Sequence, residues 1–123
     1  MLKIIPLISL VSLLTTISQL FLKKGLMKIG GIRINNFSEL AESFLKLIQE
    51  KYIIIGVFIA LVAAFGWLNI ISRKDLTLVF PISGGIFYIL LFLFSWFFLG
   101  ENITIWRIIG TIMILIGISI ILK

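Results

Sequence analysis

The sequence contains no cysteine and no histidine, and only five of its 123 residues are acidic. Without cysteine the chain has neither a disulfide framework nor a thiolate metal site. Without histidine it lacks the commonest metal ligand and the side chain that most often serves as a general base near neutral pH. The few carboxylates are also not clustered, and we find no nucleophile–base pair in the sequence, so we expect no metal site, no cofactor and no enzymatic activity.

Extended polar stretches are equally scarce. Hydrophobic residues make up 61% of the chain and charged residues 13%, and the mean hydropathy is +1.26. This composition lies far from that of soluble globular proteins and predicts a multi-pass integral membrane protein. The formal net charge is +6, but the cations are scattered at the ends of apolar runs, where lipid headgroups and topology account for them. No nucleic-acid partner is expected.

Four apolar runs divide the chain. They predict membrane spans over residues 4–22, 52–72, 76–99 and 105–122. Each is close to the length of about 20 residues that crosses a bilayer as a helix. The polar turns between the second, third and fourth spans are so short that these spans must form antiparallel hairpins. The first run follows a lysine, as in a signal peptide, but the spans behind it indicate a retained helix.

The segment between the first and second spans is predicted to hold a connector and a helix. Residues 25–36 are expected to be a connector, with Gly30 and Gly31 as helix breakers. Residues 37–50 show an amphipathic period that predicts a short interfacial helix with Ser38 as its N-cap, or else an extension of the second span. The predicted fold is thus a single domain, residues 1–123: an all-α membrane protein, a four-transmembrane-helix bundle with one interfacial helix.

One face of the first span is polar. Its residues recur every three or four positions, and they are Ser9, Ser12, Thr16, Gln19 and Lys23, with Thr15 at the margin. Such spacing places them on one side of a helix. In one interpretation the hydroxyls bond to carbonyls of their own helix and the glutamine bridges to a neighbouring helix. In the other, the row lines a polar path through the membrane.

The other three spans contain small residues and, in the third span, a proline. In the second span a ridge that permits close helix contact consists of Gly56, Ala60 and Ala64. A candidate hinge near the start of the third span consists of Pro81, Gly84 and Gly85, with a bent but packed helix as the alternative. A stripe for close packing or dimer contact on the last span consists of Gly110 and Gly117.

The acidic residues all lie in connectors or at the ends of spans. They are Glu39, Glu42, Glu50, Asp75 and Glu101. No carboxylate is therefore expected at mid-membrane, where a proton-driven antiporter normally needs an ionisable group.

Three groups of residues occur in an order that resembles a known family. They are Leu14–Lys23 in the first span, Val79–Ser83 in the third, and Gly100–Thr104 with Arg107–Gly110 and Gly117 around the last. Together they resemble the first-helix, third-helix and last-helix motifs of four-span members of the drug/metabolite transporter superfamily. The resemblance covers essentially the whole chain except residues 25–51.

Two branches of that superfamily differ at positions that can be compared here. The small multidrug resistance branch has a first-helix glutamate eight residues before the lysine, where this chain has Thr15, and a tryptophan is expected where Ser83 stands, although Phe80 is kept. The chain is more similar to the EamA-like flippase subunits that move aminoarabinose-phosphoundecaprenol across the inner membrane. The similarity rests on Gln19 with Lys23, on Pro81 and on the missing glutamate.

The resemblance implies a flippase subunit of the plasma (inner) membrane that moves a lipid-linked sugar phosphate. Its partners would be membrane lipid and a second copy or a related four-span subunit. The substrate-binding residues would be Lys23 and Lys24 for the phosphate and Ser12, Thr15, Thr16 and Gln19 for the sugar, and Asn69 and Tyr88 are further candidates with interhelical or belt positions as the alternative. Other functions still open are export of small cations and a non-transporting role in assembling a transporter.

Overall fold

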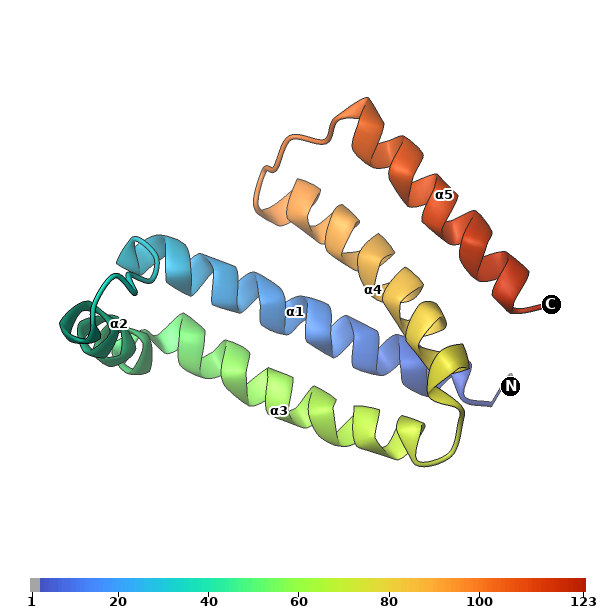
Figure 1. Cartoon of the computed structure of the whole chain (residues 1–123), viewed down its shortest axis with the longest axis horizontal. Coiled ribbons are helices and arrows are strands. Elements are labelled where there is room, and N and C mark those ends of the chain that lie inside the picture. Colours follow the sequence, from blue (N-terminus) through green and yellow to red (C-terminus); the bar gives the residue numbers. More distant parts are fainter. Residues whose placement is uncertain (1–2) are drawn as a thin grey trace.

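The structure is a computed structural model that describes residues 3–123, and it consists of five α-helices joined by short connections (Figure 1). The helices are α1 (Ile5–Ile29), α2 (Phe37–Gln49), α3 (Lys51–Ile71), α4 (Leu76–Phe98) and α5 (Ile105–Ile121). No β-strand occurs in the part of the chain that the structure describes. The predicted all-α architecture is confirmed. Three helices, α1, α3 and α4, are long and apolar enough to cross a membrane, and α5 is apolar but shorter, at 17 residues.

Helix α1 continues beyond the predicted end of the first span. The expected connector began at Gly25, but residues 25–29 are helical, so this part of the prediction is wrong. The reason is tertiary packing: Gly25 is buried against α3, and a Cβ atom on it would lie 2.6 Å from the Ile53 side chain. Gly30 and Gly31 end the helix as predicted, with φ values of 78° and 87° and with both backbone N–H groups donating to the carbonyl of Leu26.

Helix α2 begins one residue after Asn36, which is its N-cap. The Asn36 side chain accepts a hydrogen bond of 2.8 Å from the backbone N–H of Glu39, so the prediction of Ser38 as the cap is wrong. Asn36 has the extended backbone that a cap requires, whereas Ser38 already lies within the first turn. The buried Ser43 hydroxyl fastens α2 to the connector, because it accepts from the N–H of Arg33 at 3.0 Å and donates to the Arg33 carbonyl at 3.2 Å.

Helices α1 and α3 form the closest antiparallel pair, and glycine permits their contact. A Cβ atom on Gly56 would lie 2.9 Å from the Leu22 side chain and 3.2 Å from the Leu22 backbone nitrogen. The Ser18 hydroxyl donates a 2.7 Å hydrogen bond to the Gly56 carbonyl. The predicted small-residue ridge is therefore confirmed at Gly56. Ala60 and Ala64 instead line a groove, and the buried alanine of α3 is Ala63.

Helix α4 crosses α1 near the start of α1 and diverges from it toward the other end (Figure 1). The crossing is held by apolar packing around Val79 and Ile82 and by a 3.4 Å contact between the hydroxyls of Ser12 and Ser83. Helix α4 runs without a break through Pro81, so the structure contains no helix interruption at the candidate hinge.

Helix α5 packs on α4 alone among the described helices, and none of its residues is buried. Gly85 lies in this contact, where an added Cβ atom would collide with the Ile118 side chain. Gly84, Gly110 and Gly117 have no atom within 4 Å of the position that a Cβ atom would take. The stripe of α5 that carries Gly110 and Gly117 is thus unpartnered within the described chain.

Candidate functional site

The polar side chains of α1 divide into two rows with different surroundings. The first row lies in helix–helix contacts: Ser12 and Thr16 are buried, and the Thr16 hydroxyl donates to the Ser12 carbonyl of the same helix at 2.8 Å. Ser12 in turn contacts Ser83 of α4. This agrees with the interpretation in which the hydroxyls serve packing. Neither residue lines the three cavities described below, and neither does the half-buried Ser9.

The second row faces a line of cavities along the side of α1 that is turned toward α4. It consists of Thr15, Gln19 and Lys23, which recur every four residues and so lie one above another on the helix. The Thr15 hydroxyl donates to the Val11 carbonyl at 2.8 Å. Gln19 and Lys23 each line two neighbouring cavities, so the cavities follow one another along the helix.

The first cavity is a groove of about 390 Å³ among α1, α3 and α4. Its wall carries the rings of Trp67 and Phe80, which meet edge to face with centroids 5.0 Å apart. Its polar lining residues are Thr15, Ser18, Gln19 and Ser83, and the Ser18 hydroxyl is itself buried against Gly56. The groove is mostly apolar and suits an apolar chain or a weakly polar group.

The second cavity, of about 760 Å³, separates the later halves of α1 and α4. Five leucines and Met27 form its apolar lining, and Gln19, Lys23, Ser95 and Glu101 supply its polar groups. This is the region in which the two helices diverge in Figure 1. The cavity therefore links the groove near Gln19 to the charged residues near the last turn.

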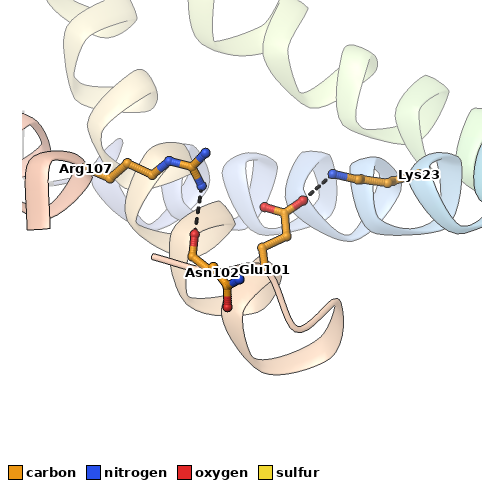
Figure 2. A network of polar contacts seen from close by, with 4 residues as sticks. All are labelled: Lys23, Glu101, Asn102 and Arg107. Atoms are coloured by element: carbon orange, nitrogen blue, oxygen red, sulfur yellow. Dashed lines mark hydrogen bonds and ion pairs between the residues drawn. The ribbon is translucent and has the colours of Figure 1, made fainter. Parts of the chain in front are cut away.

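The third cavity, of about 570 Å³, holds the charged residues and is bounded by α1, α4 and the start of α5. Lys23 forms an ion pair with Glu101 of the α4–α5 turn, and an Arg107 guanidinium N–H donates to the Asn102 carbonyl at 3.0 Å (Figure 2). Two cations and one carboxylate line this cavity, so its formal charge is positive. The remaining polar and aromatic lining comes from Tyr88, Ser95, Trp96 and Asn102.

The local sequence explains how Arg107 and Glu101 are placed. Gly100 takes a φ of 65°, which turns the chain back after α4. Thr104 then caps α5, because its side-chain oxygen accepts a 3.4 Å hydrogen bond from the Arg107 N–H. This cap fixes Arg107 in the first turn of α5, beside the turn that carries Glu101.

The structure brings four of the eight predicted substrate-binding residues to these cavities: Thr15, Gln19, Lys23 and Tyr88. Lys24 and Asn69 are exposed and line none of the three. The Asn69 carbonyl accepts from the Ser72 hydroxyl at the opposite end of the molecule from Lys23. Among the hinge candidates, Gly84 lines the groove and Gly85 packs on α5.

Two charged residues of the site, Glu101 and Arg107, were not among the predicted substrate-binding residues. Topology could have identified them, because hairpin connections place the last turn at the same end of the molecule as Lys23. No group of three or more acidic side chains that could hold a metal ion occurs within residues 3–123. No protein-family model, curated protein or solved structure matches the chain.

Proposed function

We propose that this chain is a four-span membrane protein, a transporter subunit that moves a lipid-linked sugar phosphate between the two leaflets. The observation that carries the proposal is the third cavity, where Lys23 of α1 and Arg107 of α5 line one space together with hydroxyl and amide groups. A lysine and an arginine supply the point charge and the planar donor that phosphate oxygens accept. Tyr88, Ser95 and Asn102 offer hydrogen bonds to sugar hydroxyls.

The surface of α5 supports its assignment as the fourth span. Its 17 residues carry a single charge, Arg107 in the first turn, and every other side chain that could meet solvent is apolar or a small hydroxyl. A helix that is apolar on all sides belongs in lipid or in the interior of an assembly. Its length of about 25 Å approaches the ~30 Å hydrocarbon thickness.

Helix α2 is proposed to lie in the membrane interface. Its outward face carries Phe37, Leu40, Phe44, Leu45 and Ile48, all of them exposed. On another side, Lys46 and Glu42 form a 3.6 Å ion pair. An amphipathic helix with this division buries its apolar face among acyl chains while its charges remain in water.

In the proposed mechanism the apolar tail of the substrate remains in lipid while its headgroup moves along the row of Thr15, Gln19 and Lys23. Lys23 and Arg107 attract the phosphate at one end of the path, and Gln19 offers exchangeable hydrogen bonds further in. A second copy, or a related subunit, is proposed to close the path through the unpartnered stripe of Gly110 and Gly117. Rocking of α4 about residues 81–85 would then alternate access between the two sides.

Translocation in proteoliposomes tests this function. The purified chain is reconstituted with a fluorescent polyprenyl-phosphate sugar, and a membrane-impermeant quencher reports the headgroups that reach the outer leaflet. Lys23→Ala and Arg107→Ala are each expected to lower the rate by roughly tenfold or more, because a headgroup phosphate loses a charged partner worth about 1.5–3 kcal/mol.

The matched control is Lys74→Ala, which removes an exposed lysine from the α3–α4 turn at the other end of the molecule. It is expected to leave the rate unchanged. Equal rates for the wild type, Lys23→Ala and Arg107→Ala would refute the proposal. Release of protons on addition of a small cationic drug would instead indicate a cation exporter.

A further inference from the structure

The ion pair between Lys23 and Glu101 lies where two cavities meet. Both the 760 Å³ cavity and the 570 Å³ cavity are lined by Lys23 and Glu101, and also by Leu91 and Ser95 of α4. Figure 2 shows the two side chains extended toward each other from α1 and from the α4–α5 turn. The pair therefore forms part of the lining that the two cavities share.

This pair is weakly held, because both side chains are partly exposed. The Lys23 side chain is 52% exposed and that of Glu101 is 34% exposed. Ion pairs with such exposure contribute little to stability. The backbones of α1 and α5 make no direct contact, so breaking the pair would leave the helix packing intact. The nearby Arg107 is bonded only to a neutral carbonyl, which leaves its charge available to an incoming anion.

We propose that Glu101 is an internal competitor for the anionic group of the substrate. It occupies Lys23 until a phosphate displaces it, and the displacement joins the two cavities into one path for the headgroup. This inference rests on the proposed function and adds a selectivity to it. A phosphate engages Lys23 and Arg107 together, whereas a carboxylate would only replace the carboxylate already present. The site is therefore expected to select phosphate-bearing lipids over fatty acids.

The test is binding of a short-chain isoprenyl monophosphate to the full chain in detergent, followed by tryptophan fluorescence, since Trp96 lines the cavity. Glu101→Gln keeps the shape and removes the competing charge. It is expected to bind the phosphate more tightly, by up to about fivefold, the upper end of what removal of an exposed ion pair gives. Glu101→Asp keeps the charge on a shorter side chain, and its affinity for the phosphate is expected to lie between those of the wild type and Glu101→Gln.

A double variant separates competition from a general change in charge. In a Lys23→Ala background, Glu101→Gln is expected to give no gain, because nothing remains for Glu101 to occupy. Glu42→Gln, which breaks another exposed glutamate–lysine pair, is the matched control and is expected to change nothing. An isoprenyl carboxylate of the same length is expected to bind at least tenfold more weakly than the phosphate.

The experiment distinguishes failure of the competitor role from failure of the proposed function. If Lys23→Ala abolishes phosphate binding while Glu101→Gln leaves it unchanged or weaker, the competitor role is wrong and the proposed function stands. If Glu101→Gln gives the same gain with and without Lys23, the competitor role is also wrong. If the phosphate binds the wild type and Lys23→Ala equally, both proposals fail.

Discussion

Hydroxyl groups that look equivalent in the sequence of α1 have different energetic roles. The Thr16 hydroxyl donates to a carbonyl of its own helix, so its hydrogen bond does not join two helices. The Ser18 hydroxyl is fully buried and donates to the Gly56 carbonyl of α3. Only the second kind of bond contributes to the association of helices, and Ser18 did not belong to the predicted polar row.

Ser18→Ala is expected to destabilise the bundle by about 0.5–1.5 kcal/mol, the range of interhelical hydrogen bonds in membrane proteins. The measurement is reversible unfolding in mixed detergent. Ser119→Ala on α5 is the matched control, because its exposed hydroxyl bonds to the Ile116 carbonyl of the same helix. Equal losses for the two variants would contradict the role given to Ser18.

Lys23 shows what the sequence could establish about the site and what it could not. Its position at the end of a polar row indicated a polar path, and the family resemblance made it a candidate phosphate ligand. The structure places it beside two cavities. Its partner Glu101 is 78 residues away in the chain. No local pattern reports such a contact, since it depends on how far α1 and α4 diverge.

At the scale of the helices, apolar runs were sufficient to place α3, α4 and α5 within one residue at each end. They failed at the end of α1, where the predicted span stopped at residue 22 and the predicted connector began at Gly25, although the helix continues to Ile29. Packing against Ile53 overrides the low helix propensity of glycine, which amounts to about 1 kcal/mol. Helix ends that depend on contact with another helix are therefore poorly predicted from local sequence.

The proposal that α5 crosses the membrane as a fourth span can be tested by thiol labelling. The sequence has no cysteine, so each introduced cysteine is the sole thiol. With four spans, Lys74→Cys and Lys123→Cys in sealed vesicles are expected to react with an impermeant maleimide to the same extent. Asn35→Cys and Asn102→Cys would lie on the other side of the membrane. They are therefore expected to be labelled in the fraction of molecules in which residues 74 and 123 are inaccessible. If Lys123→Cys followed Asn102→Cys instead, α5 would not cross the membrane.

At the scale of the whole molecule, the outward surfaces of α3, α4 and α5 consist mostly of large apolar side chains. Such a surface is stable only in lipid or in an assembly. The single chain also leaves its cavities open and the Gly110–Gly117 stripe without a partner. These features support a dimer in which the path beside α1 is enclosed by a second subunit.

Native mass spectrometry of the detergent-solubilised protein tests the central claim most directly, because one spectrum reports both the number of chains and the bound lipid. When the partner is a second copy of this chain, the account predicts two chains of 13.9 kDa together with a phosphate-bearing, lipid-linked sugar. In Lys23→Ala the two chains are expected to persist without that lipid. A wild-type particle free of any phosphate-bearing lipid, or a Lys23→Ala particle that retains the same lipid, would contradict it.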